Sequence, residues 1–84
     1  MLIGKVVGSV VSTRKHEKLL GNKFMVVEIA AKMGKTRLVA VDKIGAGVGE
    51  NVLIATGSAA RTGGLEGVPV DAAIVGIIDE GQAL

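Results

Sequence analysis

The chain has 84 residues, a length that allows one domain, spanning residues 1–84, with a single small core. It has no cysteine and only one histidine, His16, so disulfides, thiol chemistry and cysteine-based zinc sites are excluded and other metal sites have few ligands. Ten Lys and Arg against eight Asp and Glu give a formal charge of +2, which is too small for the electrostatic footprint of a dedicated nucleic-acid binder.

The apolar content is high for so short a chain, at 49% of residues, and it consists almost entirely of aliphatic side chains with Phe24 as the single aromatic. Such a composition suits closely packed strands. A monomer of this size cannot bury all of its apolar surface, and no disulfide supports it, so the sequence predicts assembly with further copies of the chain.

The N-terminal segment meets a charge at Lys5, too early for a secretory signal, and no apolar run approaches the length of a membrane span. We therefore expect no membrane association and a location in the cytoplasm.

Residues 2–12 contain pairs of adjacent valines that are separated by Gly, Lys or Ser. This pattern predicts a strand with both faces partly apolar. Residues 13–22 form a charged loop that ends in a Gly21-Asn22 turn signal. Residues 23–31 and 36–42 are two further apolar runs separated by a short glycine-containing interval, a pattern typical of a β-hairpin.

A glycine-rich stretch, Gly45-Ala46-Gly47-Val48-Gly49-Glu50, predicts tight backbone before a strand over residues 51–55. Ser58-Ala59-Ala60-Arg61 has helical character for about one turn, with Ser58 as N-cap and Gly63-Gly64 as terminator. Pro69 opens a last strand over residues 70–78, which Asp79-Glu80-Gly81 ends.

Five short strands with one helical turn and no βαβ spacing predict an all-β fold, a small closed or nearly closed barrel. Closure of a barrel removes exposed sheet edges.

Catalytic and cofactor signals are weak. The glycine-rich stretch differs from a dinucleotide fingerprint because its third glycine falls one position early and no helix pattern follows. His16 lies in a charged loop and is expected to be a solvated surface residue rather than a catalytic base. The carboxylates Asp42, Asp71, Asp79 and Glu80 are expected to serve strand ends and turns.

Four segments cover almost the whole chain in order: Met1–Gly8, Val39–Leu53, the loop Gly57–Arg61 and Pro69–Asp79. Together they resemble one family, the bacterial microcompartment vertex proteins. The resemblance implies an oligonucleotide-binding (OB)-like barrel that forms homopentamers at the corners of a polyhedral shell, as in carboxysomes and metabolosomes. It also implies hexameric shell proteins as partners, with no reaction, cofactor, metal or nucleic acid.

The resemblance assigns roles to two sets of residues. One set belongs near the subunit contact or the central opening: Gly57, Ser58, Ala59, Ala60 and Arg61. The other forms the signature turn of the family: Asp42, Gly45, Gly47, Gly49 and Glu50. The family commonly has a second serine where this chain has Ala59. Arg61 is expected to make interface hydrogen bonds, or else to be an exposed helix-end arginine.

Two other classes of function stay open at this point. A small barrel can bind single-stranded nucleic acid or a small ligand, although base stacking requires aromatic side chains that this chain lacks apart from Phe24. An enzyme or regulatory subunit whose site forms only between subunits is the other possibility.

Overall fold

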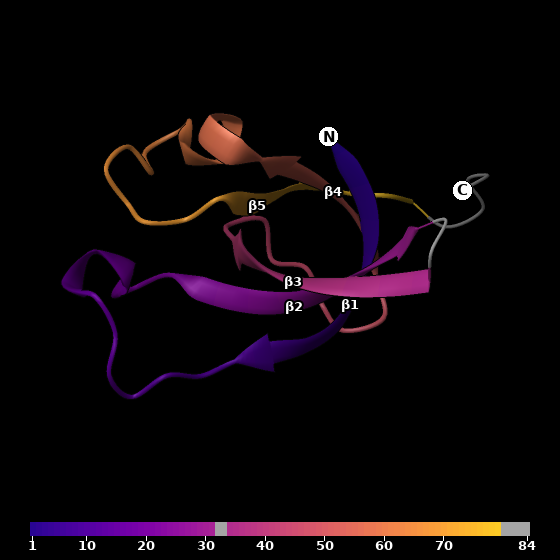
Figure 1. Cartoon of the computed structure of the whole chain (residues 1–84), viewed down its shortest axis with the longest axis horizontal. Helices are drawn as coiled ribbons and strands as arrows, with labels where there is room; N and C mark the ends of the chain where they lie inside the picture. The colour runs from indigo at the N-terminus through magenta and orange to yellow at the C-terminus, as the bar shows by residue number, and fades with distance from the viewer. Residues whose placement is uncertain (32–33, 80–84) are drawn as a thin grey trace.

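The computed structural model describes residues 1–31 and 34–79 of the chain. Five strands close into a barrel in the order β1-β2-β3-β5-β4, and two short 3₁₀ helices lie in the connections (Figure 1). The elements are β1 (Leu2–Val10), η1 (Glu17–Leu19), β2 (Lys23–Ala31), β3 (Gly34–Asp42), β4 (Asn51–Thr56), η2 (Gly57–Arg61) and β5 (Ala72–Ile77). This confirms the prediction of an all-β, five-stranded OB-like barrel.

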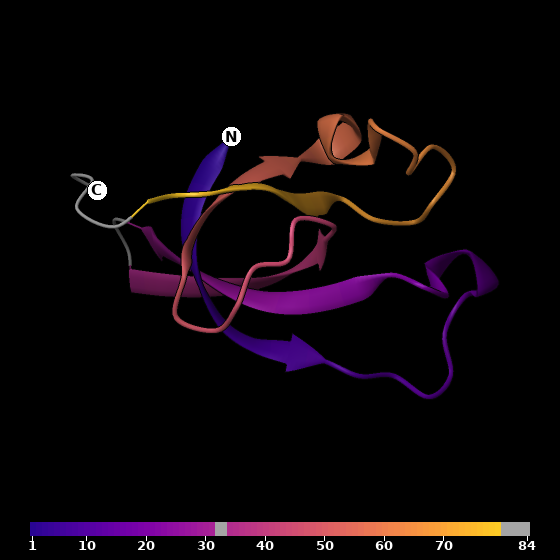
Figure 2. The ribbon, with the colours of Figure 1, turned by 180° about the vertical axis from the view of Figure 1, so that it is seen from behind.

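Barrel closure depends on two pairings between strands that are distant in sequence. β1 pairs antiparallel with β4, where Leu2 faces Ile54, and β3 pairs parallel with β5, where Val41 faces Ala73. β2 and β3 form the predicted hairpin, with Lys23 opposite Asp42 at one end. Figure 2, seen from behind, shows β5 lying beside β4 across the top of the barrel.

The core lies inside the barrel because alternate residues of each strand point inward. On β2 the inward residues are Met25, Val27 and Ile29, all buried. A second, smaller cluster lies on the outside of the barrel wall, where Val41 and Ala73 pack against Ala60, Leu65 and neighbouring side chains. This outer cluster holds η2 and the segment after it against the sheet.

The strand ends differ from the predictions in several places. β1 stops at Val10 rather than residue 12, β3 begins at Gly34 rather than residue 36, and β4 extends to Thr56. β5 begins at Ala72, two residues later than expected, and ends at Ile77. Residues 80 and 81 of the predicted strand terminator lie outside the described residues.

The short helical turn is present, but its predicted N-cap is wrong. The residue before η2 is Thr56, and no side chain caps the helix. Ser58 instead lies inside η2 and is exposed. The glycines after it act as expected, since Gly63 and Gly64 both have positive φ. Within the described residues, no helix is long and apolar enough to cross a membrane.

Candidate interaction surface

The signature turn is organised by the carboxylate of Asp42, which is almost fully buried at the end of β3. Its Oδ1 accepts hydrogen bonds from the backbone N–H groups of Ile44, at 2.9 Å, and Gly45, at 3.0 Å. Its Oδ2 accepts a third from the N–H of Ala46, at 2.9 Å. A single side chain therefore satisfies three successive turn donors, which agrees with the predicted role of Asp42 in turn structure.

The second half of the turn is held by Glu50 and by β1. The Oε1 of Glu50 accepts from the N–H of Gly47 at 2.7 Å, and the N–H of Gly49 donates to the Val6 carbonyl at 2.8 Å. Gly45 and Gly49 have φ of 95° and 96°, a conformation that L side chains rarely adopt. The glycine-rich stretch is thus a rigid connection between strands.

The η2 segment lies on the outside of the barrel (Figure 1), where Ala60 is buried while Ser58 and Ala59 are exposed. Arg61 is half-buried, and its Nη1 donates to the carbonyl of Val70 at 2.8 Å. The N–H of Gly57 donates to the Asp71 carbonyl at 2.8 Å. These two bonds fix the loop between η2 and β5 at its base.

Part of the predicted η2 set lies beside the turn, because Ala59 and Ala60 share a hollow with Ile44, although none of the five predicted turn residues lines it. This shallow hollow of about 220 Å³ is lined by Ile44 from the turn, Ala59 from η2 and Val75 from β5, among others. Ile44 and Val75 are about half-exposed, at 51% and 45%. The signature turn and η2 thus border a common, partly apolar area.

The outer face of β1, β2 and β3 is apolar toward one end. Register places Val10, Phe24 and Val41 in one outward row across the three strands, and Gly8, Val26 and Val39 in the next. The row beyond is charged, with Lys5, Glu28 and Arg37. The inward residues of these strands already form the barrel core, so the sheet is apolar on both sides at this end.

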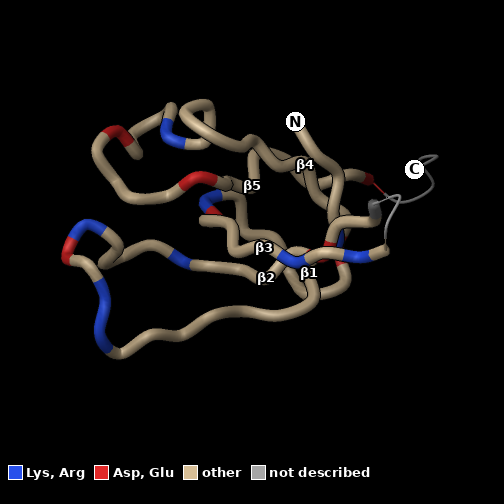
Figure 3. The backbone as a smooth tube through the Cα atoms, viewed as in Figure 1, with Lys and Arg blue, Asp and Glu red and all other residues tan. Residues whose placement is uncertain are grey.

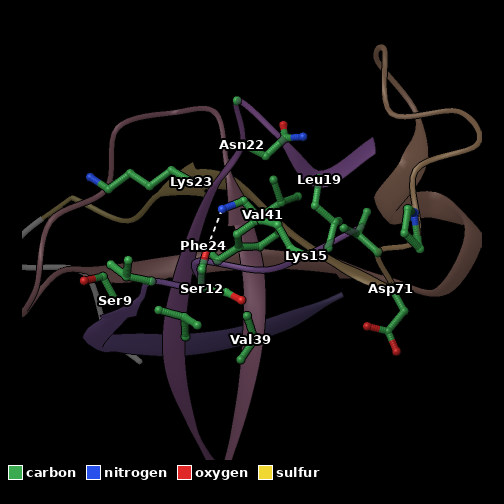
Figure 4. A pocket seen from close by; sticks show the side chains of 15 residues that line it. Ser9, Ser12, Lys15, Leu19, Asn22, Lys23, Phe24, Val39, Val41 and Asp71 are labelled. Carbon is green, nitrogen blue, oxygen red and sulfur yellow. Dashed lines mark hydrogen bonds between the residues drawn. The ribbon is translucent and has the colours of Figure 1, made fainter. Parts of the chain in front are cut away.

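Two loops project past this apolar end of the sheet, and Figures 1 and 2 show both on the same side of the barrel. We call residues 11–22 the first arm and residues 62–71 the second arm. Between them lies a hollow of about 680 Å³ whose floor includes Phe24, Val39 and Val41 (Figure 4). Leu19 lines it from the first arm and Val70 from the second.

Local hydrogen bonds stiffen the first arm. Ser12 Oγ donates to the Arg14 carbonyl, and Lys15 Nζ donates to the Ser12 carbonyl, each at 2.6 Å. The backbone N–H of Lys18 donates to His16 Nδ1 at 3.1 Å, so the exposed His16 caps η1. This confirms the prediction that His16 is a surface residue.

Charge is distributed unevenly between the two arms, as Figure 3 shows by colour. The first arm carries three basic residues, Arg14, Lys15 and Lys18, against one acid, and the second arm carries two acids, Glu66 and Asp71. The rim of the hollow therefore has no strong excess of one sign, unlike a groove that follows a phosphate backbone.

An exposed ion-pair group lies on the charged row of the outer face. Glu28 Oε2 is 3.3 Å from Arg37 Nε and its Oε1 is 3.5 Å from Lys35 Nζ. The hydrogen bond from Arg37, together with the charge of Lys35, lowers the pKa of Glu28 below its ordinary value of 4.5.

The other candidate groups do not converge. Among residues 1–31 and 34–79, no three His, Asp or Glu side chains come together in a way that could hold a metal ion. The carboxylate of Asp42 accepts the hydrogen bonds of its turn, while Asp71 lies on the rim of the larger hollow. Glu80 lies outside the described residues.

Neither the apolar outer face nor the larger hollow was predicted from the sequence. A signal was present: β2 and β3 carry apolar residues at successive positions, such as Phe24 and Met25 or Ala40 and Val41, rather than in alternation. Such runs are typical of strands covered on both faces. Only the strand over residues 2–12 was predicted to be apolar on both faces.

Comparison with known proteins places the chain in a family of shell components. Residues 1–79 match the family described as "Ethanolamine utilisation protein EutN/carboxysome", and the chain belongs to this family. It is 48% identical to the bacterial microcompartment shell vertex protein GrpN of Rhodospirillum rubrum, over 94% of this chain and 93% of GrpN. It is 45% identical to the carboxysome shell vertex protein CcmL of Gloeobacter violaceus, over 94% of this chain and 83% of CcmL.

Solved structures agree with the sequence relatives. The structure of Gloeobacter violaceus CcmL superposes with a TM-score of 0.85 at 44% identity, covering 94% of this chain and 86% of that one. The GrpN pentameric microcompartment shell protein from Rhodospirillum rubrum superposes with a TM-score of 0.79 at 41% identity, covering 100% of this chain and 99% of that one. The fold is therefore that of a shell vertex protein.

Proposed function

We propose that this chain is a structural vertex protein of a bacterial microcompartment shell and that five copies close into a ring. The observation that carries the proposal is the match along nearly the whole chain to GrpN, whose solved structure is described as pentameric. The apolar outer face of the barrel supports it independently, because a monomer would leave that face in water.

The proposed mechanism is geometric. Flat layers of hexameric shell tiles cannot close a polyhedron, and a five-fold unit at each corner supplies curvature and seals the gap. The chain would act within such a shell in the cytoplasm, with hexameric shell proteins as its neighbours. The rigid turn over residues 42–50 and the barrel both suit a part that must hold a fixed shape.

Within the ring, we assign Gly57–Arg61 to a position near the subunit contact or the central opening, and the turn from Asp42 to Glu50 to the shape of the surface beside it. The exposed Ser58 and Ala59 support this assignment, because Ala59 lines a shallow hollow that also includes Ile44 and Val75. Ala59 leaves no hydroxyl at its position, so Ser58 is the hydroxyl of this segment that could donate to a neighbour.

The function we propose involves no catalysis, cofactor or metal. Nucleic-acid binding is the weaker alternative, because the relatives are shell vertex proteins and Phe24, the sole aromatic, is half-buried against the outer cluster. A stacking surface for bases requires exposed aromatic rings.

Native mass spectrometry of the purified chain tests the oligomeric state directly. We expect a species of five chains at micromolar concentration. A spectrum dominated by monomer at that concentration would rule out the proposed ring.

Co-expression tests the role in the shell. When hexameric shell proteins are produced with this chain, we expect closed particles in electron micrographs, and open sheets or tubes when it is omitted. Equal closure with and without the chain would contradict the vertex role even if the chain is pentameric.

A further inference from the structure

Closure of the barrel leaves part of β3 without a neighbouring strand. β5 pairs with β3 only at Val41 and Asp42, although β3 begins at Gly34. On that side, no strand within residues 1–31 and 34–79 pairs with β3 over residues 34–40, and most of these residues are exposed. We call this side of residues 34–40 the open edge.

The register of the sheet shows which backbone groups face the open edge. The N–H and the carbonyl of Val6 bond to the glycine-rich turn and therefore away from β2. Because backbone bonds alternate along antiparallel strands, Val27, which lies opposite Val6, bonds on its other side to Leu38 of β3. The alternate residues of β3, Lys35 and Arg37, then direct their N–H and carbonyl groups to the open edge. Such a row of groups is a template for a further strand.

The side chains beside the open edge leave an excess of positive charge. Lys35 and Arg37 both pair with Glu28, at 3.5 and 3.3 Å, and their side chains are 73% and 67% exposed. Two open edges from two copies would bring these cations against one another, and like charges opposite each other destabilise strand pairing. Charge complementarity therefore disfavours a second open edge as the partner and favours an acidic strand.

The inner side of the open edge is partly apolar. Leu38 is half-buried and packs against the core of the barrel. Side chains of an added strand would alternate between the two faces, so those opposite Lys35 and Arg37 would point outward and the one opposite Leu38 would point inward. The matching sequence alternates acidic with aliphatic residues.

We propose that the open edge of β3 binds an extended segment of another protein, in which acidic and aliphatic residues alternate, as an additional strand of the sheet. Main-chain hydrogen bonds would supply affinity and the two cations would supply selectivity. Neither Lys35 nor Arg37 lines the two hollows described above. The contact goes beyond the proposed role in the shell, because it would attach a different protein to the vertex.

Hydrogen exchange measured by NMR tests the backbone part of the proposal. The probe is a synthetic peptide of about seven residues, a common strand length, in which glutamate and valine alternate and both ends are blocked. We expect the amides of Lys35 and Arg37 to exchange rapidly in the protein alone and at least about tenfold more slowly with saturating peptide, because a bonded amide must open before it exchanges. The amides of Thr36 and Leu38, which bond to β2, are the internal control and should exchange slowly throughout.

Two results of this experiment would overturn the proposal. One is unchanged exchange of Lys35 and Arg37 at saturating peptide. The other is slow exchange of both amides before peptide is added, since the assembled chain would then already cover the open edge. Neither result bears on the oligomeric state, so the proposed ring would stand in both cases.

Calorimetric titration tests the selectivity with matched variants. Arg37→Gln should weaken peptide binding by about two- to fivefold, because one cross-strand charge pair is lost. Lys5→Gln makes the same change of charge in the same row of the outer face, but on β1, and should leave binding unchanged. Equal weakening by both variants would contradict the proposal. So would equally tight binding of a peptide with lysine in place of glutamate, or of the original peptide with methylated backbone nitrogens, which cannot donate to the open edge.

Discussion

The guanidinium of Arg61 donates to the main-chain carbonyl of Val70, nine residues further along the chain, at 2.8 Å. This bond joins the end of η2 to the last turn of the second arm and so fixes the position of Val70 in the wall of the hollow. Arg61 thus bonds within its own chain, and its effect on a neighbouring subunit would be exerted through Val70.

Arg61→Ala should lower the free energy of unfolding by about 1 to 3 kcal/mol, because a partly buried carbonyl loses a charged donor. It should also weaken the ring, since the second arm is no longer held in place. The stability of Arg61→Lys should lie between that of the original chain and that of Arg61→Ala, because lysine can supply one donor without the planar fork. Urea denaturation and native mass spectrometry measure the two effects. The exposed Arg14 on the first arm, changed to alanine, is the matched control, and an equal response of both variants would contradict the role of the Val70 bond.

Asp42→Asn should destabilise the chain by about 2 kcal/mol or more, because a neutral amide offers one oxygen to three N–H donors, one buried and two partly buried, and turns its own N–H group toward one of them. Urea denaturation at fixed protein concentration gives the measurement. The same substitution at Asp79, which is exposed after β5, should change the midpoint little. Identical midpoints for the two variants would show that the turn does not depend on the carboxylate.

Gly4→Ala should destabilise the barrel by about 1 to 3 kcal/mol, because the added methyl group overlaps the Val27 side chain and lies 3.1 Å from the Glu28 carbonyl oxygen. Gly8 on the same strand is the control, since a methyl group there has no neighbour within 4 Å. Thermal melting of both variants at equal concentration compares them. Equal melting temperatures for Gly4→Ala and Gly8→Ala would refute the close packing of β1 on β2.

Glu28→Gln should remove a stabilising interaction whose strength depends on pH. The hydrogen bond from Arg37 and the charge of Lys35 hold the folded-state pKa of Glu28 below the ordinary value of 4.5. The interaction is therefore fully present above about pH 4.5 and is lost as the pH falls through the lower, folded-state pKa. The difference in melting temperature between the two chains should exist at neutral pH, shrink on acidification below about pH 4.5, and decrease with added salt. A difference that does not change with pH would exclude the carboxylate as its source.

The strand content was predictable because it depends on local pattern. The limits of β2 match the prediction, since its apolar run begins directly after Gly21-Asn22 and is separated from the next apolar run in the sequence by a short interval that contains Gly34. The late start of β5 was not predictable, because Val70 packs with the outer cluster and its carbonyl accepts from Arg61. That contact joins residues from different parts of the fold and leaves no periodic signal in the sequence.

The candidate site was predictable in part for a similar reason. Asp42 and the glycines that follow it act within a few residues of one another, so their turn chemistry can be recognised locally. The hollow depends on register: Phe24 faces Val41 across one strand pair and Val10 across another. Register between strands separated by a long arm cannot be read from one sequence, so the outer apolar row became visible only in the folded barrel.

The closing pairs of the barrel also constrain when the chain can fold. Leu2 at the start of β1 pairs with Ile54, and β5 is inserted between β3 and β4, so the last strand completes a sheet that the first strand began. Contacts between residues so distant in sequence slow folding, because a long loop must be ordered before they form. On the ribosome, therefore, β1 would lack its β4 partner until residues 51–56 had emerged, and the barrel would close only after β5 had followed.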